Sequence, residues 1–395
     1  MTHTSLVIKM TDPRHKKICE ALRRRFLLSQ THMSKRHDVW RKAEEQFIAY
    51  MPERDVDATR RLKRDGGKPQ YTTLVVPFSY AVLMTAHTYW TSVFLSRNPV
   101  FQYAARHGET KSNVQAVEAL IDYQVNVGKM LVPFYIWLLD AGKYGIGILG
   151  NYWSEERIVI ASIEEVETML FNVIPTGKTT KKKITKTING YRGNKLFNIR
   201  PFDFYPDPRV PLHRYQEGEF CAVYTELGWN MILKQQAAGE YFNIEELRKV
   251  RNTIQNRSEN GAAKLDRPGQ DGLLSDTDMN DVDFQPLVEM AVELVPKDWG
   301  LGNGTSPEKW MFTTTKDFSI LIGARPLGCI HNQYPYIIQM FEVEGYSMNA
   351  RGMMEVIEPL QNTMDWLMNT HFYNVRKVLN DQFIVDPSRV VMKDV

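Results

Sequence analysis

The clearest periodic pattern in the chain is a run of apolar residues near its end. Between residues 352 and 380, apolar positions recur every three or four residues, the spacing of one face of an α-helix. Pro359 lies inside this run, so the regular helix is expected to begin there, with proline at its first position. A long helix with one apolar face needs neighbours, either from this chain or from copies of it. This face consists of Met353, Ile357, Leu360, Met364, Leu367, His371 and Val375.

Two earlier segments are also predicted to be helical. Residues 110–142 show the same three-four spacing and predict a long helix that Pro133 would kink. Residues 71–96 contain no Asp, Glu, Lys or Arg and are long enough to cross a bilayer. Their many Thr and Ser residues favour a helix that is buried on all sides by protein over a membrane span.

Alternating patterns predict β-structure in two other parts of the chain. Residues 154–224 contain short alternating runs between Gly and Pro turns, and residues 284–327 resemble a β-meander. Between them, residues 225–256 are predicted to be helical, and residues 256–282 to form a mobile polar loop. The aspartates of this loop lack the Gly and terminal Glu of a calcium loop. These elements together predict an α+β fold.

Basic residues gather in two of these segments. Residues 12–50 predict a basic helix, which is either a solvated amphipathic helix or a contact for nucleic acid or an acidic partner. A lysine cluster lies in a predicted hairpin, where it either guards an edge strand or contacts phosphate. The net charge of the whole chain is only +3, which argues against a dedicated DNA-coating protein. The candidate contact residues are Arg23, Arg24, Arg25, Lys181, Lys182 and Lys183.

The segment DAGKYGIGILGNYW, residues 140–153, has the glycine spacing of a dinucleotide-binding loop, Gly145-x-Gly147-x-x-Gly150. Such a loop follows a strand and precedes a helix, whose N-terminus holds the pyrophosphate. Here the predicted helix comes first and the strand follows. The glycines are therefore expected to end a helix and to let a strand pack closely, and no cofactor is predicted.

Catalytic and metal-binding patterns are weak throughout the sequence. Asp203, Asp207 and His213 lie close together, but the prolines around them favour a turn over an acidic nuclease-like site. The nucleophile elbow Gly-x-Ser-x-Gly does not occur. The sequence therefore predicts no catalytic residue and no metal site, and the protein is not expected to be an enzyme.

The order of these features resembles that of tailed-bacteriophage portal proteins, the head-to-tail connectors, from about Tyr71 onward. Residues 138–153 resemble their helix, glycine-spaced break and strand. RPFDFYPDPRV, residues 200–210, resembles a strand that ends in an Asp-Pro turn. Residues 352–390 resemble the Gly-initiated stem helix and the segment that enters the clip. In that family a clip, a returning helix and a channel loop follow. Either the sequence is a fragment, or the remainder is not included in it, or its parts correspond differently to those of the family.

The resemblance implies a structural role. Portal subunits form a ring, commonly of twelve copies, at one vertex of the capsid, and double-stranded DNA passes through its channel. The implied location is the virion, and the host cytoplasm during assembly. The implied partners are copies of the chain, the major capsid protein, the terminase large subunit and head-tail adaptor or tail proteins, with no membrane and no cofactor.

The resemblance also implies a division of the chain into a mainly helical wing region (1–160), a β-rich wing region (161–345), a stem helix (346–380) and the start of a clip (381–395). The apolar face of the stem helix would lie between subunits, and Arg376 and Lys377 would contact DNA or a neighbouring subunit. The alternative is a membrane-associated or nucleic-acid-binding protein that uses residues 71–96 or the basic N-terminal helix.

Overall fold

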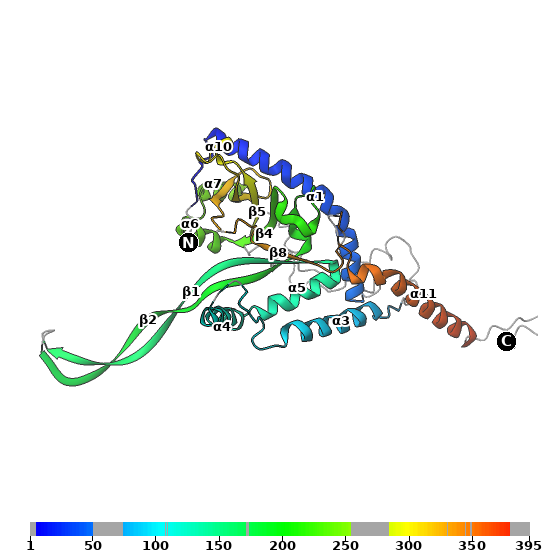
Figure 1. Ribbon diagram of the computed structural model, residues 1–395, viewed down its shortest axis with the longest axis horizontal. Coiled ribbons are helices and arrows are strands. Elements are labelled where there is room, and N and C mark those ends of the chain that lie inside the picture. Colours follow the sequence, from blue (N-terminus) through cyan, green and yellow to red (C-terminus); the bar gives the residue numbers. More distant parts are fainter. Residues whose placement is uncertain are drawn as a thin grey trace, which may run out of the picture.

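The computed structural model combines α-helices with antiparallel sheets (Figure 1), which confirms the α+β class. The predicted loop at 256–282 with its aspartates, and the predicted start of a clip at 381–395, lie outside the described residues. The structure describes residues 5–49, 74–106, 108, 110–170, 174–253, 284–329, 331–343, 345–347 and 350–379.

The body of the molecule is built on a five-stranded antiparallel sheet with the order β3-β4-β5-β6-β7. Its last three strands are consecutive neighbours, which confirms the meander predicted for residues 284–327. The strands are β3 (Phe204–Pro206), β4 (Phe220–Gly228), β5 (Phe284–Leu294), β6 (Glu308–Thr315) and β7 (Leu321–Pro326). Short helical turns connect or flank them, η2 (Pro201–Asp203), η3 (Leu212–Glu217) and α10 (Pro296–Trp299).

The long helix α1 (Pro13–Phe47) packs against this sheet. It confirms the basic helix that the sequence predicts over residues 12–50. Asp12 caps its first turn by accepting a hydrogen bond from the backbone of Arg14. The Phe26 ring lies 4.7 Å from the ring of Tyr205, next to β3 and the core of the body. The apolar residues of α1 thus face the sheet and leave most of its basic residues on the outer side.

Two short helices, α6 (Trp229–Ala237) and α7 (Ile244–Thr253), pack near β5 and β7 in a separate apolar cluster. The prediction of one helical segment over residues 225–256 is therefore wrong at its start, because β4 continues to Gly228. Leu227 pairs with Gln285 of β5. Cross-strand pairing with a buried neighbour has overridden the local helical pattern.

A second, three-stranded sheet carries a long hairpin. The strands β1 (Ile146–Leu170) and β2 (Ile174–Ile199) pair along their length, and β8 (Tyr336–Met340) pairs only with the first residues of β1. The hairpin extends away from the body in Figure 1. The two long strands β1 and β2 take the place of the series of short strands that the sequence predicts for this region. The boundary between the helical and β-rich wing regions, which the resemblance implies at residues 160 and 161, falls inside β1.

The helices α4 (Lys111–Val127) and α5 (Leu131–Tyr144) replace the single kinked helix predicted over residues 110–142. The break lies before Pro133, at Gly128 and Lys129, and Lys129 has a φ of 56°. Pro133 instead occupies the first turn of α5, where its missing N–H leaves no hydrogen bond unmade.

The uncharged segment forms α3 (Phe78–Leu95). Only one side of this helix is buried, at Ser79, Leu83 and His87, whereas Tyr89 and Phe94 are mostly exposed. The prediction of a helix buried on all sides is therefore wrong for the single chain. Among the described residues, no helix combines the length and the apolar character needed to cross a bilayer.

The last described helix is α11 (Met353–Leu379), which leads away from the body on the side opposite the hairpin tip (Figure 1). It begins before Pro359, because the N–H of Val356 already bonds the carbonyl of Gly352 at 3.2 Å. The predicted long helix is thus confirmed, and its predicted start at Pro359 is wrong.

Candidate assembly interface

The start of α11 crosses the end of α5 in direct backbone contact. Gly145 ends α5 with a φ of 89°, and a Cβ atom there would lie 2.6 Å from the carbonyl oxygen of Ala350. On the other side, a Cβ atom on Gly352 would lie 2.6 Å from the carbonyl oxygen of Lys143. The strand β1 follows, so this glycine segment ends a helix and starts a strand, as the sequence predicts.

Ion pairs from α1 hold the first turns of α11. Arg36 lies 2.6 Å from a carboxylate oxygen of Glu355, and it also donates to the carbonyl of Ala350 at 3.2 Å. Nearly two turns further along α1 and one turn further along α11, Lys42 lies 3.8 Å from Glu358. Bidentate guanidinium contacts fix direction as well as distance, so these residues orient α11 against the body.

A polar cluster lies beneath this crossing. The hydroxyl of Tyr144 donates to Glu44 at 2.5 Å, and the same carboxylate lies 3.7 Å from Lys143 and 3.8 Å from Arg200. Burial raises the pKa of the nearby Asp140 carboxyl to about 7, although the positive charges of Lys143 and Arg200 oppose this effect. A partly buried carboxyl with a raised pKa therefore lies next to this crossing.

Three polar residues along one face of α11 bind the extended backbone that leads into α3. Gln361 accepts hydrogen bonds from the N–H and hydroxyl groups of Ser79 at 3.0 and 3.1 Å. Asp365 accepts from the N–H of Val76 at 2.8 Å. Asn369 both accepts from the N–H of Leu74 at 2.8 Å and donates to its carbonyl at 2.9 Å. We call Gln361, Asp365 and Asn369 the polar ladder.

The sequence analysis did not identify the polar ladder. Its signal was the spacing of four residues between Gln361, Asp365 and Asn369, which places polar groups on one line along a helix. Such a line indicates a partner with free backbone groups, but the sequence does not show which segment supplies them.

The face of α11 opposite the polar ladder is apolar and exposed. Leu360 is 60% exposed and Leu367 is 55% exposed. With 3.6 residues per turn, Leu360 lies about 100° from Gln361 and about 140° from Asp365 around the helix axis, and Leu367 lies about 120° and about 160° from them. We call this face the α11 stripe, and its members are Val356, Leu360, Leu367, His371 and Val378.

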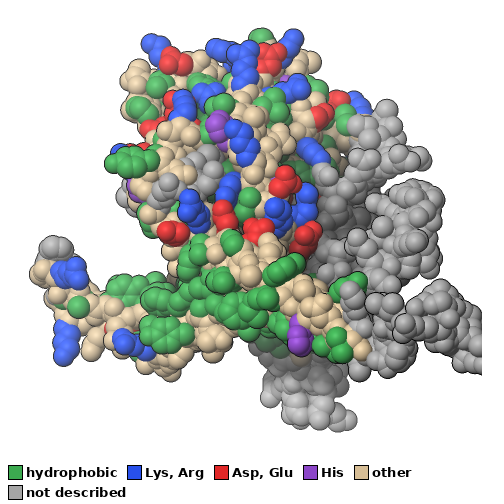
Figure 2. Space-filling model, turned by 90° about the vertical axis from the view of Figure 1, so that its right-hand side faces the viewer, with side chains coloured by type: hydrophobic (Ala, Val, Ile, Leu, Met, Phe, Trp, Pro, Cys, Tyr) green, Lys and Arg blue, Asp and Glu red, His purple; other side chains and the backbone are tan. Residues whose placement is uncertain are grey.

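Exposed apolar side chains continue from α11 onto the neighbouring helices. On α3 they include Tyr89 and Phe94, and on α5 they include Val132 and Tyr135. Figure 2 shows apolar side chains gathered across the lower part of this face, at the height where Figure 1 places α3, α5 and α11. Contiguous apolar surface of this kind marks interaction sites in soluble proteins.

The predicted stem-helix residues are either partly covered by their own chain or exposed to solvent. Met353 packs against the buried cluster of Ala43, Leu83 and Met354, so it supports the helix from within its own chain. Ile357 and Met364 are half-buried. The exposed members of the predicted set are Leu360, Leu367, His371 and Val375.

The predicted basic contacts lie in separate places. Arg376 and Lys377 occupy the last turns of α11, and the structure does not describe their side chains. Arg25 lies over the ring of Trp299, 5.4 Å from its centre, while Arg23 and Arg24 are exposed on α1. The lysines lie on β2, where Lys181, Lys182 and Lys183 stand opposite Glu165, Glu164 and Ile163 of β1.

The acidic residues considered for a nuclease-like site form a structural turn. Asp207 is buried and accepts hydrogen bonds from Arg209 at 2.9 Å and from the backbone of Glu219 at 3.0 Å. Burial opposes its ionisation, but these hydrogen bonds hold the pKa of Asp207 below its usual range. The interpretation as a turn is confirmed. The described residues also contain no group of three or more His, Cys, Asp or Glu side chains arranged to hold a metal ion.

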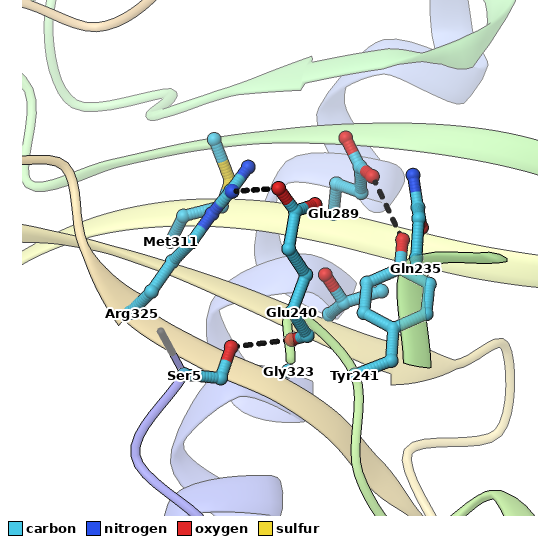
Figure 3. A pocket seen from close by; sticks show the side chains of 9 residues that line it. Ser5, Gln235, Glu240, Tyr241, Glu289, Met311, Gly323 and Arg325 are labelled. Atoms are coloured by element: carbon cyan, nitrogen blue, oxygen red, sulfur yellow. Dashed lines mark hydrogen bonds and ion pairs between the residues drawn. The ribbon is translucent and has the colours of Figure 1, made fainter. Parts of the chain in front are cut away.

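A small polar pocket lies in the body, between the end of α6 and the sheet (Figure 3). Arg325 lies 3.4 Å from Glu240, whose backbone carbonyl accepts a hydrogen bond from Ser5. Tyr241 donates to Glu289 at 3.4 Å, and burial raises the pKa of this carboxyl. The cavity measures about 30 Å³, which is room for one water molecule and too little for an organic substrate.

Comparisons with known proteins add no assignment, since no protein-family model matches the chain and no curated protein matches it significantly.

Proposed function

We propose that the chain is a subunit of a tailed-bacteriophage portal, the ring around the channel through which double-stranded DNA enters and leaves the capsid. The observation that carries this proposal is the two-sided character of α11. Its polar ladder is bound to its own chain, while its opposite face exposes the α11 stripe. This is the arrangement that a stem helix needs when it is packed between neighbours in a ring.

The partner of the α11 stripe is another molecule. The contacts of Arg36, Gln361 and Asn369 fix α11 along its length, so the helix cannot turn its stripe toward its own body. Exposed apolar side chains also lie on the neighbouring helices α3 and α5, whose sequences differ from that of the stripe. When one surface of a subunit binds a different surface of the next, repetition of the contact closes a ring or builds an open filament.

The charge of the chain suits passage of DNA. The net charge of +3 is small for 395 residues, and a channel with many phosphate contacts would hold DNA instead of letting it slide. In this proposal the chain is structural, and terminase hydrolyses ATP. The further partners are the major capsid protein and the head-tail adaptor or tail proteins, and the ring belongs to the virion after assembly in the host cytoplasm.

The proposal is tested by negative-stain imaging of the purified, complete gene product. We expect rings with a central hole. The double substitution Leu360→Asp and Leu367→Asp should yield monomers, because it places two charges in a desolvated interface. The matched control is Met231→Asp on α6, where the side chain is similarly exposed at 47% but lies away from the α11 stripe.

The outcomes separate the parts of the proposal. The control should still form rings. When each of the three proteins is compared in its dissociated, monomeric form, all three should have the same circular dichroism spectrum and the same urea midpoint. Monomers of the complete wild-type product would overturn the proposed function. Rings formed by the double-aspartate variant would show that the α11 stripe is not the contact between subunits.

A further inference from the structure

The β1–β2 hairpin has no third strand for most of its length. The strand β8 pairs with Ile146–Gly150 of β1, and the N–H of Asn151 bonds the carbonyl of Pro335 at 3.0 Å. Beyond that point β1 and β2 pair only with each other among the described residues. We call residues 151–170 and 174–198 the arm. It is about 65 Å long at the usual rise of a strand. Near the body the arm packs on α4, where the rings of Tyr191 and Tyr123 stack 6.0 Å apart. Beyond that contact it is a two-stranded ribbon, which is marginally stable in water by itself, so the outer part of the arm calls for a further neighbour.

The two strands of the arm carry opposite charge. In register, Glu164 stands opposite Lys182, and Glu165 stands opposite Lys181. Nearer the body, Arg192 lies 3.0 Å from Glu155. The β1 segment has one basic residue, Arg157, and its acidic residues are Glu155, Glu156, Glu164, Glu165 and Glu167. The β2 segment has no acidic residue, and its bases are Lys178, Lys181, Lys182, Lys183, Lys186, Arg192 and Lys195.

This charge pattern does not suit a protected edge. Charged side chains commonly guard edge strands, and edges that carry the same sign repel each other. Here the outer edge of β1 is acidic and the outer edge of β2 is basic, so the β1 edge of one copy attracts the β2 edge of another. Two copies related by a two-fold axis would place like edges together, and directly opposed like charges destabilise a sheet.

We propose that the arms of successive copies lie side by side, with the basic β2 edge of one copy against the acidic β1 edge of the next. This head-to-tail contact rests on the proposed self-assembly of the chain and adds a second contact to that of the α11 stripe. Copies related by a rotation bring different edges together at every contact. Glu164, Glu165, Lys181 and Lys182, which already stand opposite each other within the arm, would then have residues of opposite sign on their other side as well.

The direction of the strands also suits this contact. In copies related by rotation, the β1 strand that leaves one body lies beside the β2 strand that returns to the next. The two edges are therefore antiparallel, and their free backbone groups can form a ladder. Ile158 stands opposite Ile188, and both are about half exposed, at 50% and 47%. Neighbouring arms would continue this apolar strip across the contact.

The test exchanges charges between the two strands. The variant carries Glu164→Lys, Glu165→Lys, Lys181→Glu and Lys182→Glu, and it keeps each opposite-charge pair within its own arm. We expect it to assemble as the wild type does. In a mixture with the wild type, every contact between the two proteins places like charges together. The share of complexes that contain both proteins should therefore be about tenfold below the share expected from random mixing. Native mass spectrometry of equal amounts, one of them tagged, measures this share.

Salt and a smaller exchange provide the controls. The sorting should disappear in 1 M salt, where the screening length is about 3 Å, and sorting that persists there would contradict a charge-based contact. If the fourfold variant does not fold, the exchange Glu164→Lys with Lys182→Glu makes the same test.

The outcomes distinguish the arm contact from the ring. Free mixing at low salt would overturn the arm contact and leave the proposed ring in place. Open filaments in which the wild type and the variant do not mix would support the arm contact and contradict the ring. Monomers of both complete proteins would overturn the arm contact together with the proposed function.

Discussion

The five-stranded sheet and α11 use apolar side chains in opposite ways. In the sheet, Phe204, Phe220 and Phe312 are fully buried between α1 and the strands. On α11, Leu360 and Leu367 are mostly exposed, and polar contacts hold the helix in place. Burial within one chain stabilises the sheet before any partner arrives. The residues of the α11 stripe, unlike Met353 and Met354 at the start of the helix, contribute to stability only when another molecule covers them.

Replacing one phenylalanine with alanine in each region tests this contrast, and it is the comparison for which we expect the largest difference in the free energy of unfolding. Phe312→Ala removes a fully buried ring and should lower the free energy of unfolding by about 3–5 kcal/mol. Phe372→Ala removes a ring that is 46% exposed on α11, and it should change the same quantity by less than about 1 kcal/mol. Urea unfolding of the monomer measures both. Equal losses would show that α11 belongs to the core of the single chain.

The crossing of α5 and α11 joins these two regions, and its stability should depend on pH through Asp140. Burial raises the pKa of this carboxyl from its ordinary 3.8 to about 7. Between about pH 4 and pH 7 the folded chain therefore binds more protons than the unfolded chain, and stability falls as the pH rises. The contribution is fully favourable below about pH 4 and is lost above the folded pKa.

Asp140→Asn should remove this dependence. The asparagine variant should gain roughly 2–4 kcal/mol relative to wild type between pH 4 and pH 8, measured as the difference in unfolding free energy at each pH. Asp38→Asn, at an exposed position of α1 with 79% side-chain exposure, should follow the wild-type curve. Parallel curves for wild type and Asp140→Asn would show that this carboxyl ionises as freely in the folded chain as in the unfolded one.

The sequence predicted the elements whose patterns are set within the element itself. The three-four spacing located α11, and the basic amphipathic pattern of residues 12–50 located α1. The order of helix, glycine and strand argued against a dinucleotide loop, and the structure has this order, with Gly145 at a positive φ. Alternation with turn residues located the meander of β5, β6 and β7. In each case the residues that determine the structure lie within a few positions of one another.

The errors arose where a distant segment decides the structure. The pairing of β4 with β5 extends a strand into residues that look helical. The absence of charge on α3 predicted burial, but the single chain covers only one side of this helix. The polar ladder shows the same limit for the candidate site, because its partners near Leu74 and Ser79 lie almost 300 positions away along the chain. Sequence spacing identifies a face, and only the fold identifies what covers it.

A smaller effect is expected from the glycine that lets the two helices cross. Gly145→Ala places a side chain at a φ of 89°, and its Cβ would lie 2.6 Å from the backbone of Ala350 and of Arg351. Neither backbone can rotate away as a side chain could, so α11 must shift relative to α5. The cost should be about 2 kcal/mol in the free energy of unfolding.

The matched control for that substitution is Gly228→Ala. Gly228 has an ordinary φ of −65°, and no atom lies within 4 Å of the position of an added Cβ. Gly228 is the N-cap residue of α6, where alanine is less favourable than glycine, so its replacement should cost less than about 1 kcal/mol. If the crossing orients α11 for assembly, Gly145→Ala should also weaken self-association, whereas Gly228→Ala should leave it unchanged. A stable Gly145→Ala variant with normal assembly would show that α11 tolerates a different angle at its start, and that the contacts of Arg36 and the polar ladder suffice to place it.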